Sequence, residues 1–217
     1  MKFETSAGPV DFTPTRLIVA GWTGRDRAAV QHHIDELAAI GVPAPSTVPL
    51  YYQCAPALLT QENAIQVLGG ETSGEAEPFL AKIDGTIWLG LASDQTDRAL
   101  ETYSVAHSKQ ICEKPVANTL WRYDEVVDHL DQLELCSWIK ENDEWASYQK
   151  GTLASILPLA SLMDGTTFEN DTAMLCGTLP AIGGVRPGAD FKMSLHDAVM
   201  KRTIEWSYGT AVLKAIA

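Results

Sequence analysis

Three carboxylates, those of Glu75, Glu77 and Asp94, lie at the two ends of the segment GEAEPFLAKIDGTIWLGLASD. Its centre, Asp84-Gly85, is a favoured dipeptide for a two-residue type I′ turn, because both turn residues need a positive φ. With this turn, the register of a β-hairpin places Glu75 opposite Asp94. Side chains alternate along a strand, so Glu77 shares a face with Glu75, and Asp94 joins them from across the ladder.

The expected burial of this hairpin makes the three acids a candidate metal site. Its two faces are both largely apolar, which is typical of a strand pair buried on both sides. Carboxylates about 5 Å apart repel by roughly 3 kcal/mol at an effective dielectric constant near 20, so a buried trio needs a cation. Oxygen ligands favour Mg²⁺ first, with Mn²⁺ or Ca²⁺ as substitutes. Alternatively, Glu75 and Glu77 lie in a frayed, solvated strand end weakened by Pro78.

A candidate general base precedes the hairpin. His33 and Glu36 are three residues apart in a helix predicted to begin at about Asp26 and to end near Gly41. They share a helix face, so the carboxylate of Glu36 can orient the imidazole of His33 to accept a proton from water. The other interpretation is a polar pair on the surface of an amphipathic helix.

Three further places offer polar groups near the hairpin or late in the chain. Lys109 is a candidate cation for a substrate carboxylate or a developing oxyanion, or else a solvated lysine. Arg98 supports the acids from behind or lies on the surface. Gly177 and Thr178 open a glycine-containing loop that can approach a ligand closely.

The remaining patterns predict a mainly β protein with some helix. Strands are expected at residues 11–22, 50–54, 190–195 and 201–213, and a helix interrupted by Pro158 at residues 151–163. Residues 177–190 read as a loop rich in glycine and proline. The stretches 98–110 and 124–135 mix polar and apolar residues without a clear period.

Composition narrows the class of protein. The 217 residues have a hydrophobic content of 46% and a charged content of 20%, which is ordinary for a globular protein and suits one domain. The net charge of −12 argues against nucleic acid and anionic membranes as partners. A small anionic substrate is still compatible with this charge, because one metal ion reverses the local field.

The cysteines and the amino terminus favour a cytoplasmic protein. The four cysteines lie far apart and form no Cys-x-x-Cys pair, so neither a zinc site nor a disulfide framework is indicated. The first residues lack the apolar segment of a signal peptide, and there is no run of eighteen apolar residues.

The order of these motifs resembles the fumarylacetoacetate hydrolase superfamily. That family has a Glu-x-Glu pair, then an Asp in a D-x-[ST]-x-R run, a Lys, and a late Gly-Thr loop. The matching residues are Glu75 and Glu77, Asp94 with Thr96 and Arg98, Lys109, and Gly177 with Thr178. The family's His-x-x-Glu dyad resembles His33 and Glu36. The resemblance covers roughly residues 30 to 195.

The resemblance implies a mixed β-roll with few helices, usually a homodimer. It implies one catalytic domain over residues 1–217, with an N-terminal strand and lid-like helix in residues 1–45 and a metal-binding β-roll core in residues 46–217. Two differences fall on the substrate side of the pocket. Ala99 stands where the family usually has an acid, and LPAIGG replaces the middle of the family's loop.

The first hypothesis is an enzyme that uses Mg²⁺ or Mn²⁺ to hydrolyse a carbon–carbon bond in a small acylpyruvate-type 2-oxo acid. Glu75, Glu77 and Asp94 would be the metal ligands, and His33, Glu36 and Lys109 the catalytic residues. Gly177, Thr178 and Arg98 would contact the substrate. Two alternatives stay open: a metal-dependent decarboxylase, hydratase or isomerase of a 2-oxo acid, and a non-catalytic protein stabilised by Ca²⁺.

Overall fold

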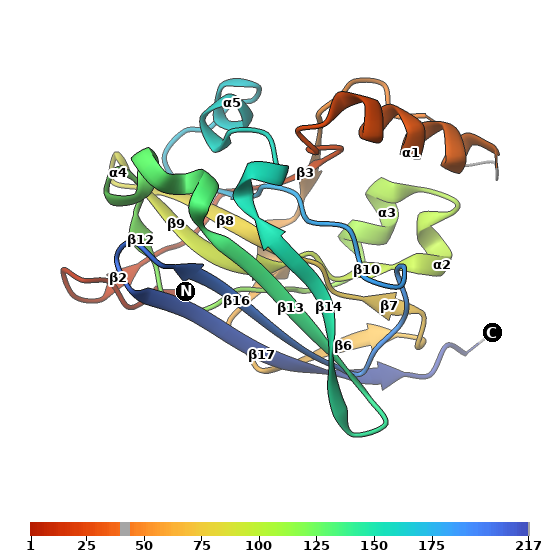
Figure 1. Cartoon of the computed structure of the whole chain (residues 1–217). Helices are drawn as coiled ribbons and strands as arrows, with labels where there is room; N and C mark the ends of the chain where they lie inside the picture. Colours follow the sequence, from red (N-terminus) through yellow and green to blue (C-terminus); the bar gives the residue numbers. More distant parts are fainter. Residues whose placement is uncertain (40–43, 217) are drawn as a thin grey trace.

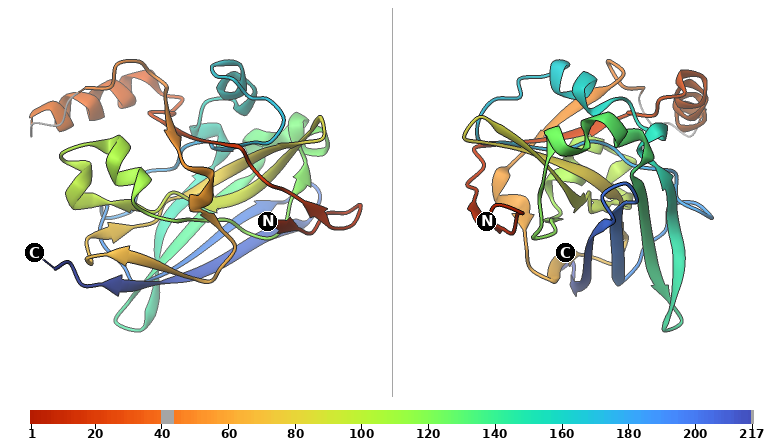
Figure 2. Two further views of the ribbon diagram at one scale, coloured as in Figure 1. Left: turned by 180° about the vertical axis from the view of Figure 1, so that it is seen from behind. Right: turned by 60° about the vertical axis from the view of Figure 1, so that its left-hand side comes forward.

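A computed structural model describes residues 1–39 and 44–216, and two β-sheets form its centre (Figure 1, Figure 2). The six-stranded sheet has the order β12 (Trp121–Arg122), β9 (Thr86–Ser93), β8 (Ala76–Ile83), β15 (Thr172–Leu175), β3 (Arg16–Gly21) and β4 (Leu50–Cys54). The five-stranded sheet has the order β14 (Glu144–Thr152), β13 (Glu134–Glu141), β16 (Asp190–Asp197), β17 (Arg202–Leu213) and β6 (Ala64–Leu68). The architecture is mainly β, as predicted.

Short elements complete the fold. Three two-stranded sheets pair β1 (Lys2–Phe3) with β2 (Val10–Asp11), β7 (Thr72–Ser73) with β10 (Thr96–Asp97), and β5 (Leu59–Thr60) with β11 (Lys114–Pro115). The α-helices are α1 (Arg27–Ala39), α2 (Arg98–Glu101), α3 (Val105–Gln110), α4 (Tyr123–Val126) and α5 (Leu159–Asp164), and short 3₁₀ segments are η1 (Pro56–Leu58), η2 (Val127–Gln132) and η3 (Leu153–Ser155). Within the described residues, no helix is long and apolar enough to cross a membrane.

The two faces of the six-stranded sheet pack against different partners. Its inner face, including Leu80 and Met174, shares one hydrophobic core with Leu135 and Met193 of the five-stranded sheet. Its outer face, including Phe79, packs in a second core with residues from the N-terminal segment and from the β5–β11 pair. The hairpin strands β8 and β9 are therefore covered on both sides, as their apolar pattern predicts.

The structure confirms the predicted hairpin. Asp84 and Gly85 have φ values of 48° and 81°, as a type I′ turn requires. In the ladder, Ile83 pairs with Thr86 and Glu77 pairs with Ala92, which is the register expected from that turn.

The helix predicted from Asp26 is α1. The side chain of Asp26 accepts hydrogen bonds from the backbone N–H groups of Ala28 and Ala29 at 2.9 and 3.2 Å, which satisfies two free donors of the first turn. Its predicted end at Gly41 lies outside the described residues. Figure 1 shows α1 on the outside of the molecule, above α3.

The unassigned stretches contain short helices and an unpredicted hairpin. Residues 98–110 form α2 and α3, and residues 124–135 contain α4 and η2 before β13 begins. β13 and β14 form a long hairpin around Asn142 and Asp143, whose φ values are 50° and 65°. This Asn-Asp turn between half-apolar strands is the signal that sequence reasoning missed.

Candidate metal centre

The three acids gather where two β-ladders meet. The β8–β9 ladder ends at the pair Ala76 and Ser93, and the β7–β10 ladder begins at Ser73 and Thr96. Asp94, between the two ladders, donates its backbone N–H to the carbonyl oxygen of Glu75 at 2.9 Å. This bond continues the hairpin by one residue and brings the acids together as the predicted register requires.

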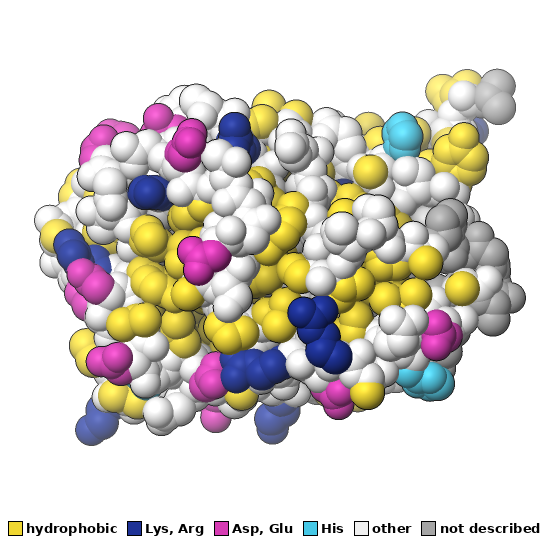
Figure 3. All heavy atoms as spheres, turned by 90° about the horizontal axis from the view of Figure 1, so that it is seen from above, with side chains coloured by type: hydrophobic (Ala, Val, Ile, Leu, Met, Phe, Trp, Pro, Cys, Tyr) yellow, Lys and Arg dark blue, Asp and Glu magenta, His cyan; other side chains and the backbone are white. Residues whose placement is uncertain are grey.

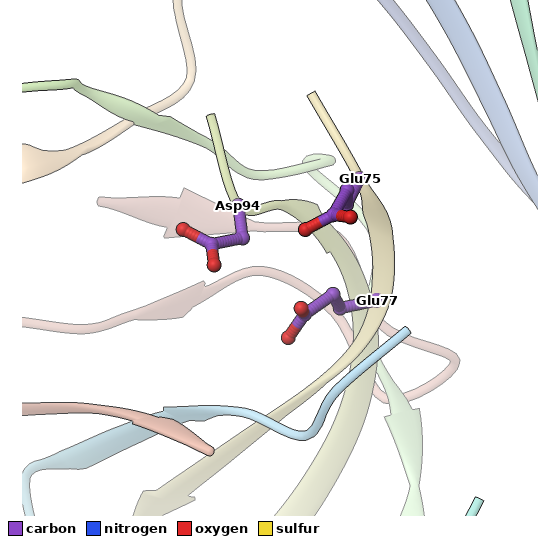
Figure 4. Close-up of side chains that lie close together, drawn as sticks. All are labelled: Glu75, Glu77 and Asp94. Carbon is purple, nitrogen blue, oxygen red and sulfur yellow. The ribbon is translucent and has the colours of Figure 1, made fainter. Parts of the chain in front are cut away.

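The carboxylates of Glu75, Glu77 and Asp94 converge on one space (Figure 4). One oxygen from each lies within 4.8 Å of the other two. Oxygens on opposite sides of a bound Mg²⁺, Mn²⁺ or Ca²⁺ are about 4 to 5 Å apart, so this spacing fits a hard divalent cation. The all-oxygen donor set fits such an ion equally well.

The burial of the three acids distinguishes this site from a solvated strand end. Glu77 is 2% exposed and Asp94 is fully buried, and the side chain of Glu75 is 16% exposed. The alternative of a frayed, solvated strand end is therefore wrong for Glu77, and Glu75 is the more exposed of the two glutamates. Pro78 leaves the pairing intact because β8 continues through it opposite Leu91.

Two lysines neutralise Asp94. The ammonium group of Lys109, on α3, donates to Oδ2 of Asp94, and Nζ of Lys114, on β11, lies 3.1 Å from Oδ1. Burial opposes ionisation of Asp94, but the two lysines outweigh it and lower the pKa of this carboxyl to about 2. Asp94 is therefore a carboxylate at neutral pH.

Glu77 has the opposite electrostatic environment. Its burial, and next the negative charge of Asp94, raise its pKa well above the ordinary value. Its Oε2 accepts the backbone N–H of Gly177 at 2.8 Å, which ties the acid cluster to the loop after β15. A cation between Glu77 and Asp94 would remove the repulsion that raises this pKa.

Arg98 lies against Glu75 in the structure. Its Nη2 is 3.3 Å from Oε2 of Glu75, its Nη1 donates to Glu101 at 2.9 Å, and its Nε donates to Ser73 at 2.7 Å. These contacts give Arg98 the supporting position behind a candidate ligand. Its direct contact with a substrate stays a prediction.

The Gly177-Thr178 loop borders the acids. The hydroxyl of Thr178 donates to the carbonyl oxygen of Ala76 at 2.7 Å and accepts from Nε2 of Gln149 at 2.6 Å. The hydroxyl hydrogen of Thr178 is therefore already donated to a backbone carbonyl of the protein. Gly177 has a φ of 92°, and a Cβ there would lie 1.7 Å from Oγ1 of Thr23, so this position requires glycine.

For the proposed base, His33 with Glu36, the structure describes the backbone but not the side chains. His33 and Glu36 both lie on α1, three residues apart, but their side chains are outside the part of the chain that the structure describes. Their pairing and their approach to the acids stay predictions.

Lys114 is a site residue that sequence reasoning missed. It is fully buried, and besides Asp94 it contacts the carbonyl oxygen of Gln95, to which its ammonium group donates. Its segment, EKPV, has no pattern that marks a buried cation. Only the parallel pairing of β11 with β5 places it beneath the acids.

A separate cavity lies elsewhere on the molecule. It has a volume of about 530 Å³ and is lined by Arg27, Thr47, Pro49, Tyr51, Leu157, Ser161 and Gly165. Tyr51 packs against the inner core, whereas its neighbour Tyr52 packs against the outer core. The ring of Tyr52 lies beneath Lys109, and the Nζ of Lys109 is 5.7 Å from the centre of that ring. The two tyrosine side chains point to opposite faces of β4, so this cavity is not the space between the acids.

Seen from above, hydrophobic side chains gather across the middle of the molecule, and charged side chains lie mostly toward its rim (Figure 3). This is the side of the molecule that carries α1 and α5 in Figure 1.

A family model named DUF2848 and described as a protein of unknown function matches residues 20–208. The chain belongs to this family. A search of curated proteins finds no match.

Solved structures match over nearly the whole chain. A candidate fumarylpyruvate hydrolase from Burkholderia cenocepacia is 16% identical, with a TM-score of 0.67 over 98% of this chain and 95% of the other. A maleylpyruvate hydrolase from Sphingobium sp. SYK-6, in complex with manganese and pyruvate, is 13% identical, with a TM-score of 0.58 over 92% and 71%. A 2-keto-3-deoxy-D-arabinonate dehydratase, complexed with magnesium and 2,5-dioxopentanoate, is 12% identical, with a TM-score of 0.62 over 96% and 76%. The fold is that of the fumarylacetoacetate hydrolase superfamily, as the motif order indicated.

Proposed function

We propose that this protein is a divalent-metal-dependent hydrolase that cleaves a carbon–carbon bond in a small acylpyruvate-type 2-oxo acid. The observation that carries the proposal is the convergence of Glu75, Glu77 and Asp94 within 4.8 Å at a buried strand end. Enzymes of the same fold that bind Mn²⁺ or Mg²⁺ and a 2-oxo acid support it.

Glu75, Glu77 and Asp94 would hold Mg²⁺ or Mn²⁺, with Ca²⁺ as a substitute. When bound, such an ion supplies Lewis acidity and a positive charge next to the substrate oxygens. Lys109, in the last turn of α3, is 6% exposed and would pair with the substrate carboxylate or with developing negative charge. Gly177, Thr178 and Arg98 would border the substrate side.

The predicted reaction begins with a proton transfer. His33, oriented by Glu36, would take a proton from water, and the oxygen would add to the distal carbonyl carbon of the substrate. The adduct would then collapse by breaking the bond to the neighbouring carbon. The electron pair of that bond would go to the pyruvate fragment as an enolate, which takes up a proton. The products are a carboxylic acid and pyruvate.

A calorimetric titration tests the metal site. Mn²⁺ is titrated into metal-stripped wild-type protein and into Asp94→Asn, which nearly preserves shape and removes one charge. We expect one bound ion in the wild type and much weaker binding in the variant. If the wild type binds no Mn²⁺, the enzymatic proposal fails. If it binds, acylpyruvates are assayed by release of pyruvate.

A lyase is the second candidate function. The dehydratase with this fold that binds magnesium and 2,5-dioxopentanoate favours it. It keeps the metal and the 2-oxo acid but does not need hydroxide to attack a carbonyl carbon. Release of carbon dioxide or of water from a 2-oxo acid, without cleavage of acylpyruvates, would favour this candidate.

The third candidate is a non-catalytic protein stabilised by Ca²⁺. Removal of Ca²⁺ would then lower the melting temperature, whereas a 2-oxo acid would cause no further shift, because only a ligand of the folded state stabilises it. A homodimer and a cytoplasmic location are parts of the proposal that rest on the sequence and the family resemblance.

A further inference from the structure

Lys114 has an unusual position for a lysine. Its side chain is fully buried, and its ammonium group lies 3.1 Å from Oδ1 of Asp94. A buried charge is costly unless it is paired and hydrogen-bonded, and here Asp94 and the Gln95 carbonyl oxygen supply the partners. The fold therefore places a buried ammonium group directly behind a candidate metal ligand.

The backbone around Lys114 is fixed. β11 pairs in parallel with β5, so that Lys114 lies opposite Leu59, and the next residue but one, Val116, forms a bridge with Ala92 of β9. Lys109, in contrast, projects from the last turn of a short helix and retains slight exposure. Of the two lysines on Asp94, Lys109 has a slightly exposed side chain, whereas the side chain of Lys114 is fully buried.

These lysines change the charge balance of the site. Metal ligation requires all three carboxylates to be ionised. With Lys109 and Lys114 beside them, the three acids keep only one net negative charge, and the neighbouring pair of Arg98 and Glu101 adds none. A divalent ion would turn this balance to one positive charge. The single carboxylate of a 2-oxo acid would then make the buried site neutral.

We propose that Lys114 makes tight metal binding depend on an anionic co-ligand. This inference rests on the proposed metal site and adds a role for one residue within it. The charge of Lys114 opposes the metal alone, because a net charge in a buried site is unfavourable. A small monocarboxylate relieves that charge, so metal and anion strengthen each other's binding, and linkage requires the effect to be reciprocal.

The test measures binding rather than activity. Mn²⁺ is titrated calorimetrically into metal-stripped protein with and without a fixed concentration of pyruvate. We expect pyruvate to tighten Mn²⁺ binding to the wild type by about tenfold, within the usual range of coupling between sites. Lys114→Met should bind Mn²⁺ alone about tenfold more tightly than wild type, and pyruvate should then change its affinity by less than about threefold.

Two further variants separate charge from other effects. Lys114→Gln loses the charge but keeps a hydrogen-bond donor, so it should behave like Lys114→Met. Lys150→Met removes an exposed lysine of β14 and should behave like wild type. Circular dichroism checks that each variant is folded.

The outcomes distinguish this inference from the proposed function. If the wild type binds no Mn²⁺, the proposed metal site fails and the role of Lys114 fails with it. If the wild type binds Mn²⁺ but both Lys114 variants keep its affinity and its response to pyruvate, only the role of Lys114 is overturned. Weaker Mn²⁺ binding in both variants would also overturn it, because Lys114 would then act by positioning Asp94.

Discussion

Two isosteric substitutions in the acid cluster should have unequal effects on the stability of the metal-free protein. Asp94→Asn and Glu77→Gln each replace a buried carboxylate by an amide of nearly the same shape. Asp94 is paired with two lysines, whereas Glu77 is held near another carboxylate by the fold. We therefore expect the free energy of unfolding to fall strongly in Asp94→Asn and to stay constant or rise in Glu77→Gln.

The expected changes in the free energy of unfolding follow from the contacts of the two side chains. Removing one partner from a buried ion pair costs about 3 to 5 kcal/mol, and Asp94→Asn leaves two ammonium groups without their carboxylate. Glu77→Gln replaces a carboxyl group whose charged form is already disfavoured by burial and by the charge of Asp94, so little favourable charge interaction is lost. The amide oxygen can still accept the N–H of Gly177. The burial cost of the charge also disappears, so we expect a gain of about 0 to 2 kcal/mol.

The assay is thermal and denaturant unfolding of both variants with a metal chelator present. For a chain of this length, the melting temperature should fall by about 6 to 20 °C in Asp94→Asn and should not fall in Glu77→Gln. Both variants should lose at least about 100-fold in affinity for Mn²⁺, because even residues that only support a ligand cost 10- to 100-fold. Equal destabilisation of the two variants would refute the electrostatic assignment of the site.

Of four further predictions, two concern pH, one concerns the glycine loop and one concerns the proposed base. The pKa of Asp94 in the folded protein, about 2, is below that of an unfolded aspartate. The contribution of Asp94 to stability is therefore present above about pH 4 and is lost as the pH falls toward about 2. Comparing the acid unfolding of wild type and Asp94→Asn measures this contribution. Because the pKa of Glu77 is raised, Mn²⁺ binding should release a proton and weaken as the pH falls, which calorimetry in buffers of different ionisation enthalpy detects. Gly177→Ala should lower the free energy of unfolding by about 3 kcal/mol or more. The control Gly8→Ala, whose Cβ would meet no atom within 4 Å, should lower it by about 1 to 2 kcal/mol. His33→Ala should bind Mn²⁺ like wild type and lose about 100-fold or more in pyruvate release from an acylpyruvate, whereas a decarboxylase would keep its activity.

The hairpin and its three acids could be predicted because local rules determine them. The Asp84-Gly85 turn sets the register, and the period of two along each strand sets which side chains share a face. From these two rules, the positions of Glu75, Glu77 and Asp94 follow without knowledge of the rest of the fold. The ladder confirms this register through Glu77 and Ala92.

The contacts that cross between distant segments could not be predicted in the same way. The lysines that neutralise Asp94 come from α3 and β11, and β11 reaches its place through a parallel pairing with β5. Two-residue strands such as these carry no periodicity. The β13–β14 hairpin was missed for another reason, because its turn is Asn-Asp and its strands include polar residues on the more exposed face.

Lys114, which sequence reasoning missed, changes how the proposed metal site is understood. A trio of buried carboxylates alone predicts strong attraction for a divalent ion and a site that is unstable without one. Lys109 and Lys114 remove most of that instability, so the metal-free protein can fold with Asp94 ionised. In the proposed site, the same two charges would reduce the attraction for the metal, and the carboxylate of the substrate would complete the charge balance. Stability without metal and the proposed dependence on an anion are therefore two consequences of one arrangement, in which Lys109 and Lys114 both lie against Asp94.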